Sequence, residues 1–105
     1  MAEVAFTDAN FQEVALDTDK LVVVDFFATW CGPCQMMAPH VEELAEEMSD
    51  VVIGKMNIDD NEETPQKYQV MSIPTVLFLK GGEVVEKLVG YQSKEALAEK
   101  IGELK

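Results

Sequence analysis

The sequence predicts an α/β fold in which a central mixed β-sheet of five strands is flanked by four helices on both faces. Three observations lead to this prediction. Residues 21–27 form a nearly unbroken apolar run, which is typical of a central strand covered on both faces. Apolar residues recur at helical spacing in the segment 37–48. The apolar runs 75–80 and 83–89 are joined by a Gly-Gly pair, which indicates a β-hairpin.

The first half of the chain alternates strand and helix patterns. Residues 4–6 form a short, weak strand, and Thr7 or Asp8 can cap a helix that ends before the polar stretch 17–20. The strand 21–27 then leads into the long helix, which has an apolar stripe on one face and four glutamates on the other. This order is typical of strand–helix–strand units in α/β proteins.

The second half continues the alternation. Residues 51–57 read as another strand, and the acidic run 59–63 leads into a short helix ending near Tyr68. That run lacks the glycine turn and the closing glutamate of a calcium loop, so we expect a solvated acidic face. After the hairpin, Ser93 can cap the final helix. Because no repeat or linker interrupts this order, residues 1–105 are expected to form a single domain.

Composition limits the classes of partner. The chain is 48% apolar and carries 8 Lys and Arg against 20 Asp and Glu, a formal net charge of −12. Because contacts with phosphate backbones or anionic lipids would be repulsive, we expect neither nucleic acid nor a membrane as partner. The start has no basic leader or long apolar segment, and the only two cysteines are neighbours. A cytoplasmic monomer is therefore expected.

The motif Cys31-Gly32-Pro33-Cys34 lies where the strand 21–27 gives way to the long helix. The first turn of a helix has unpaired N–H groups and a partial positive charge, and both favour a thiolate at Cys31. The spacing of three residues places the two sulfurs on one face, close enough to form a disulfide. Gly32 leaves room for another chain, and Pro33 suits a first helical turn. The motif therefore predicts a nucleophilic, redox-active cysteine pair.

Two other interpretations of this pair are weaker. A structural disulfide closing a loop of about four residues would contribute roughly 2 kcal/mol, against about 3 kcal/mol for a loop of fifteen. A zinc site needs about four ligands. His40 is the only further histidine or cysteine in the chain, and it lies on another face of the helix. We therefore expect no metal at the cysteines.

Two charged residues interrupt the predicted central strands. Asp25 lies within the apolar run 21–27, and Lys55 lies within the strand 51–57. Burial of a carboxylate among Val and Phe raises its pKa toward neutrality, where Asp25 can take the proton from Cys34. A salt bridge to Lys55 would keep Asp25 ionised and lower that pKa. A purely structural ion pair is the alternative to proton transfer.

Taken together, these residues resemble the thioredoxin family. The resemblance rests on Trp30-Cys31-Gly32-Pro33-Cys34 after Val-Asp-Phe-Phe-Ala, and on Lys55-Met-Asn-Ile-Asp, Ser-Ile73-Pro74-Thr and Val-Gly90 downstream. It covers essentially the whole chain and includes the order of the elements, so it is far more specific than a lone C-x-x-C. It implies the thioredoxin fold and a protein dithiol–disulfide oxidoreductase that reduces disulfides in partner proteins.

The resemblance also implies roles for individual residues. Cys31 matches the attacking thiolate and Cys34 the resolving thiol, which are joined as a disulfide after reaction. Asp25 matches a buried carboxylate that exchanges a proton with Cys34, and Lys55 matches its lysine partner. The surface that contacts substrate is expected to include Trp30, Gly32, Pro33, Ile73, Pro74 and Gly90, with a cis bond between Ile73 and Pro74.

The family takes its electrons from NADPH through a separate flavin-containing thioredoxin reductase. The resemblance therefore implies two kinds of partner, namely that reductase and proteins that contain disulfides. It also implies that this chain binds neither nucleotide nor flavin, and that its redox group is the Cys31–Cys34 pair itself.

The chain departs from the family's usual pattern in two places. Gln35 stands where Lys or Arg often follows the second cysteine, which slightly disfavours the thiolate, and Phe27 stands where a second Trp is common. Two other functions stay open. An oxidase or isomerase would run the same exchange in the opposite direction, although Pro33 favours a reductant by resemblance. A docking scaffold would not need the cysteines.

Overall fold

The computed structural model describes residues 3–105. One sheet contains all five strands, in the spatial order β1-β3-β2-β4-β5. The strands are β1 (Val4–Ala5), β2 (Val22–Phe27), β3 (Val52–Asn57), β4 (Thr75–Lys80) and β5 (Glu83–Val89). The helices are η1 (Gln12–Leu16), which is a π-helical turn, α1 (Gly32–Glu47), α2 (Glu63–Lys67) and α3 (Lys94–Leu104).

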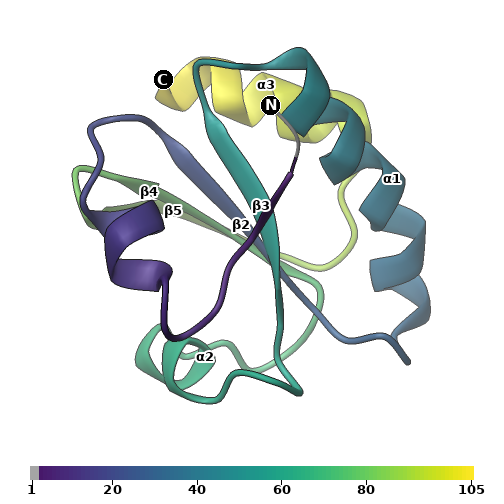
Figure 1. Ribbon diagram of the computed structural model, residues 1–105. Helices are drawn as coiled ribbons and strands as arrows, with labels where there is room; N and C mark the ends of the chain where they lie inside the picture. The colour runs from purple at the N-terminus through teal and green to yellow at the C-terminus, as the bar shows by residue number, and fades with distance from the viewer. Residues whose placement is uncertain (1–2) are drawn as a thin grey trace.

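The sheet is mixed, as the sequence predicts, and β2 lies at its centre. It pairs in parallel with β3 and antiparallel with β4, while β1 and β5 form the two edges. Because both neighbours of β2 are strands and both of its faces are covered, its backbone and its side chains are removed from solvent. Figure 1 shows β2 and β3 running side by side through the middle of the molecule.

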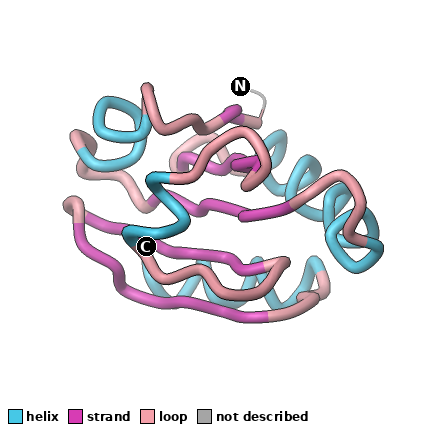
Figure 2. Tube along the Cα trace, turned by 90° about the horizontal axis from the view of Figure 1, so that it is seen from below, coloured by secondary structure: helices cyan, strands magenta, loops and turns pink. Residues whose placement is uncertain are grey.

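Helices cover both faces of this sheet. On one face, α1 and α3 pack over an apolar cluster that includes Val23, while η1 lies over a second cluster on the other face that includes Val22 and Val24. This division follows from the alternation of side chains along a strand. In the view of Figure 2, the strands run through the molecule with helical segments to either side of them.

The hairpin and the last helix form as predicted. Gly81 and Gly82 join β4 to β5 with φ angles of 61° and 82°, a left-handed backbone that glycine adopts without strain. The side chain of Ser93 accepts a hydrogen bond of 3.1 Å from the backbone N–H of Ala96 and so caps α3. Strands β2 and β3 each begin one residue later than expected.

The segment before β2 differs from the predicted helix. Thr7 and Asn10 exchange two backbone-to-side-chain hydrogen bonds of 2.8 and 3.1 Å, which close a separate turn. This reciprocal pair has the arrangement of a capping box, and the helical structure that follows it includes the π-type hydrogen bond from the N–H of Asp17 to the carbonyl oxygen of Gln12. The helix is therefore a single π-helical turn and not a regular α-helix.

Asp8 caps a different helix, 55 residues further along the chain. Its carboxylate accepts hydrogen bonds from the backbone N–H groups of Glu63 and Thr64, at 3.1 and 2.9 Å, and from the hydroxyl of Thr64 at 2.7 Å. These groups are unpaired donors in the first turn of α2, which has no cap from its own N-cap residue, Glu62. Asp8 therefore fastens α2 to the segment that follows β1.

We predict that Asp8→Ala lowers the free energy of unfolding by about 1 to 2 kcal/mol, because it leaves the first turn of α2 without its acceptor. Urea denaturation of the oxidised protein measures this loss. Asp19→Ala, at an exposed acid, is the matched control and should change little. Equal stabilities of the two variants would contradict the capping role.

Candidate active site

The two cysteines lie at the start of α1, directly after the loop that leaves β2. Cys31 is the N-cap residue of the helix, and its Sγ accepts a hydrogen bond of 3.2 Å from the backbone N–H of Cys34. Cys31 and Cys34 form a disulfide, with their Cα atoms 5.2 Å apart. One of the donors that a helix N-terminus leaves unpaired is thus aimed at the sulfur of Cys31.

The two sulfurs differ in access. Cys31 is 6% exposed and Cys34 is 2% exposed, while Gly32 and Pro33 between them are exposed. A Cβ atom added to Gly32 would meet no atom within 4 Å, so the space beside the motif is open. Another chain can therefore approach Cys31 along the Gly32-Pro33 side, whereas Cys34 faces the protein interior.

Three segments that are distant in sequence meet around Cys31. Its Sγ lies 4.0 Å from the carbonyl oxygen of Ile73, and the Ile73 side chain packs against the buried cluster that contains both cysteines. The Ile73–Pro74 peptide bond is cis. The backbone N–H of Gly90 donates a hydrogen bond of 2.8 Å to the carbonyl oxygen of Pro74. Cys31, Ile73, Pro74 and Gly90 are thereby brought together.

The loop that follows Gly90 is fastened to α1. Tyr91 and His40 form a hydrogen bond of 2.8 Å between the phenol oxygen and Nε2, and the backbone N–H of Gln92 donates to Sδ of Met37 at 3.4 Å. The sequence shows no sign of these contacts, because 51 and 55 residues separate the partners. They hold the Gly90 segment against the helix that carries the cysteines.

Trp30 projects outward beside Cys31. Its side chain is 69% exposed, and its Nε1–H donates a hydrogen bond of 3.0 Å to the carboxylate of Asp59. The sequence predicts only a solvated acidic face for residues 59–63 and gives no sign of this contact. The side chain of Gln35 donates a hydrogen bond of 2.6 Å to the carbonyl oxygen of Thr29, which fixes the loop on the other side of Trp30.

Large apolar side chains are exposed on the segments that carry these residues. They are Trp30, Met36, Met71, Val89 and Tyr91. Apolar side chains that stay exposed in a folded protein are typical of a surface that contacts another protein. Met side chains also adapt to varied partners because they are flexible and polarisable.

Asp25 is fully buried in β2, on the face of the sheet that α1 covers. Its neighbours in register are Lys55 on β3 and Val76 on β4. Neither carboxylate oxygen has a hydrogen-bond partner within the described part of the chain. Burial raises the pKa of Asp25 to about 7, against a lowering effect of Lys55 and with a further raising effect of Glu3.

Lys55 makes its ion pairs elsewhere. Within residues 3–105 its Nζ pairs with Glu3 at 3.4 Å and with Glu42 at 3.3 Å, and not with Asp25. Lys55 and Cys34 both line a cavity of about 210 Å³ that also touches Phe27. The sequence allows a salt bridge between Lys55 and Asp25, but in the structure the ion pairs of Lys55 are with Glu3 and Glu42.

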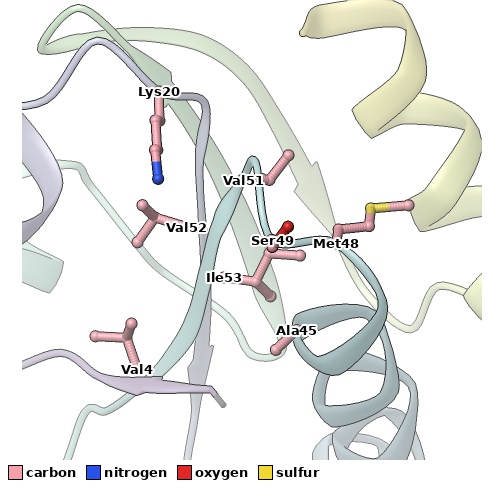
Figure 3. A pocket seen from close by; sticks show the side chains of 8 residues that line it. All are labelled: Val4, Lys20, Ala45, Met48, Ser49, Val51, Val52 and Ile53. Carbon is pink, nitrogen blue, oxygen red and sulfur yellow. The ribbon is translucent and has the colours of Figure 1, made fainter. Parts of the chain in front are cut away.

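A separate small cavity lies at the opposite end of β3 (Figure 3). It has a volume of about 130 Å³, and its polar side chains are those of Lys20 and Ser49. The other lining residues are Val4, Ala45, Met48, Val51, Val52 and Ile53. Because this lining contains neither a cysteine nor an acidic side chain, the cavity offers no group for thiol chemistry.

Within the described residues, no group of three or more His, Cys, Asp or Glu side chains is arranged to hold a metal ion. Nor does any helix in residues 3–105 have the length and apolar character needed to span a membrane.

Comparison with known proteins identifies the family. A family model described as thioredoxin matches residues 2–103. The chain belongs to the thioredoxin family. It is 54% identical over 100 residues to a thioredoxin of Bacillus subtilis, covering 94% of both chains. It is also 50% identical over 104 residues to a thioredoxin of Alicyclobacillus acidocaldarius, covering 98% of both chains.

Family membership and the site agree. The five-stranded mixed sheet with its helices is the thioredoxin fold, and Cys31 and Cys34 form a disulfide within the matched residues. The protein is a dithiol–disulfide oxidoreductase whose substrates are proteins that contain disulfides. The fold, family and activity predicted from the sequence are confirmed.

The raised pKa of Asp25 predicts a pH-dependent cost in stability. Because the folded-state pKa of about 7 exceeds the ordinary value of 3.8, the folded protein binds this proton more tightly than the unfolded chain does. The cost is absent below pH 4, grows as the pH rises to 7, and is complete above it. We predict that Asp25→Asn removes this cost. The free energy of unfolding of the oxidised variant, relative to that of the parent protein, should therefore be higher at pH 8 than at pH 4, by about 4 kcal/mol at most.

Urea denaturation of both proteins at the two pH values measures this difference. Asp19→Asn, at an exposed position, is the control and should show no comparable pH dependence. If the difference in stability between Asp25→Asn and the parent protein were the same at pH 4 and pH 8, burial would not perturb Asp25.

Proposed function

We propose that this thioredoxin family member reduces disulfides in partner proteins and is itself returned to the dithiol form by thioredoxin reductase with electrons from NADPH. The observation that carries the proposal is the position of the Cys31–Cys34 pair, in which Cys31 caps α1 and Cys34 lies behind it. The cysteine content also supports work in a reducing cytoplasm, because these two are the only cysteines. We propose that the protein acts as a monomer there.

In the first step, the Cys31 thiolate attacks one sulfur of the substrate disulfide. The substrate S–S bond breaks, its other sulfur leaves as a thiolate, and a mixed disulfide joins Cys31 to the substrate. The N-terminal end of α1 and the backbone N–H of Cys34 favour negative charge on the attacking sulfur. The greater exposure of Cys31 supports its assignment as the attacking residue.

In the second step, Cys34 loses its proton to Asp25 and attacks Sγ of Cys31. The mixed disulfide breaks, the second substrate sulfur leaves as a thiolate, and the Cys31–Cys34 disulfide forms. Two electrons have passed to the substrate, whose two sulfurs end as thiols after taking up two protons. A carboxyl group with a pKa of about 7 is suited to accept and return a proton at neutral pH. Lys55, on the cavity that Cys34 lines, modulates that exchange.

We propose that the substrate chain lies across the segments that surround Cys31. The open space at Gly32 and Pro33, the exposed ring of Trp30, and the paired backbone of Pro74 and Gly90 support this placement. Ile73 would then separate the bound chain from the buried cysteine cluster. The hydrogen bond from Trp30 to Asp59 holds the ring beside the approaching disulfide.

We predict that Cys34→Ser traps the mixed disulfide, because the resolving sulfur is missing while the attacking sulfur remains. With insulin as the substrate, non-reducing electrophoresis and mass spectrometry should show insulin chains linked to Cys31. The matched variant Cys31→Ser, which keeps only the less exposed sulfur, should trap at least tenfold less. Equal trapping by the two variants would contradict the proposed order of attack.

The direction of electron flow has its own test. We predict that the intact protein, supplied with NADPH and a thioredoxin reductase, reduces insulin over many turnovers, measured as loss of NADPH absorbance. The Cys31→Ser/Cys34→Ser double variant should be inactive. A redox titration that placed the pair among strongly oxidising disulfides would contradict the role of reductant and favour an oxidase.

A further inference from the structure

We propose that Glu3 is a positioning residue for the proton exchange between Asp25 and Cys34, because it forms with the ammonium group of Lys55 an ion pair that Asp25 does not form. The inference rests on the proposed role of Asp25 and adds a residue to it. Neither the motif nor the cysteine chemistry points to Glu3, which lies at the far edge of the sheet from β5.

The register of the sheet places Lys55 between two acids. Lys55 is aligned with Ala5 on β1 and with Asp25 on β2, and β3 lies between those two strands. Because aligned residues of parallel strands share a face of the sheet, Ala5 projects from the same face as Lys55 and Asp25, and Glu3 directly precedes β1. Glu3 and Asp25 therefore compete for one ammonium group from opposite sides.

The contacts show that Glu3, and not Asp25, forms the ion pair with the Lys55 ammonium group. Nζ of Lys55 lies 3.4 Å from Oε1 of Glu3, whereas Asp25 has no ion pair and no hydrogen bond among the described residues. The side chains of Lys55 and Glu3 are both 19% exposed, so solvent screens this pair only in part. Lys55 is thus ion-paired with Glu3 and not with Asp25, although its Nζ lies 5.6 Å from the centroid of the Phe27 ring on β2 and its charge still lowers the pKa of Asp25.

Glu3 occupies a position that is unfavourable for a carboxylate. Burial raises the pKa of Glu3, against the lowering effect of Lys55, and its Oε2 is buried without a hydrogen-bond partner in the described part of the chain. An apolar side chain would avoid this cost. The Glu3 carboxylate is therefore better explained by its electrostatic effect on Asp25 than by packing.

The other charged groups around the cluster are few. On the side of α1, Glu42 also pairs with Lys55, but it is 58% exposed, and Cys34 is held in the disulfide and carries no charge. On β4, the residue opposite Asp25 is Val76, which carries no charge. On the side of β1, Asp8 and Asp60 line a cavity of about 670 Å³ together with Glu3 and Lys55. The Asp8 carboxylate is already bound to the first turn of α2.

We predict that Glu3→Gln makes Asp25 more acidic, because Lys55 is then free to approach it and one nearby negative charge is removed. The probe is the ¹³C carboxyl signal of Asp25, followed by NMR over a pH titration of the oxidised, full-length protein. The midpoint should move toward acid by about one pH unit. The matched variant Glu42→Gln, at the more exposed partner, should move it by less than half as much.

Two further variants separate positioning from a merely structural tie. Lys55→Met should move the Asp25 midpoint toward higher pH, and in that background Glu3→Gln should lose most of its effect. If the ion pair of Glu3 with Lys55 only stabilised the fold, Glu3→Gln and Lys55→Met would change the free energy of unfolding without moving the titration midpoint of Asp25. An unchanged midpoint in Glu3→Gln or in Lys55→Met, or an undiminished effect of Glu3→Gln without Lys55, would overturn the proposal.

A separate measurement tests whether Asp25 takes the proton from Cys34. The rate at which Cys34 releases substrate from the mixed disulfide can be followed against pH in the parent protein and in Glu3→Gln. If the NMR midpoint of Asp25 moves while the pH profile of release does not, Glu3 controls Asp25 but Asp25 does not take the proton. If both move together, Glu3 acts on the resolving step through Asp25.

Discussion

The hydrogen bond from the backbone N–H of Cys34 to Sγ of Cys31 joins the chemistry of this protein to its fold. It exists because β2 ends at Phe27 and α1 begins at Gly32, so that Cys31 becomes the N-cap residue of a sixteen-residue helix. The same packing that buries β2 and α1 aims the unpaired donors of the helix at one sulfur. The resting disulfide and the attacking thiolate therefore use the same backbone geometry.

The burial of Asp25 is unfavourable for stability when its carboxylate is ionised. The central strand of the sheet would be more stable with an apolar residue there, and the carboxylate has neither a hydrogen bond nor an ion pair in the described part of the chain. The cost brings a carboxyl group that titrates near neutral pH to the face of the sheet covered by α1, the helix that carries Cys34. Glu3 and Glu42 both form ion pairs with Lys55, the residue aligned with Asp25 on β3.

Much of the fold was predictable because its local patterns agree with its packing. The Gly-Gly hairpin, the Ser93 cap and the apolar run of β2 each specify one structure with little competition. The first helical segment differs from the predicted α-helix because its backbone hydrogen bonds widen to the π pattern after the turn that Thr7 and Asn10 close. The spacing of apolar residues indicates a helix but does not mark the rare π pattern.

The sequence by itself determined the α/β class, the strand–helix junction at Cys31 and the presence of two charges in buried strands, because periodicity and motif spacing are local properties. Only the tertiary structure decided which distant groups meet. It placed Asp8 on the first turn of α2, Asp59 on Trp30, and Glu3 on Lys55. These pairings depend on strand order and register, which emerge when the whole chain packs and which no short stretch of residues encodes.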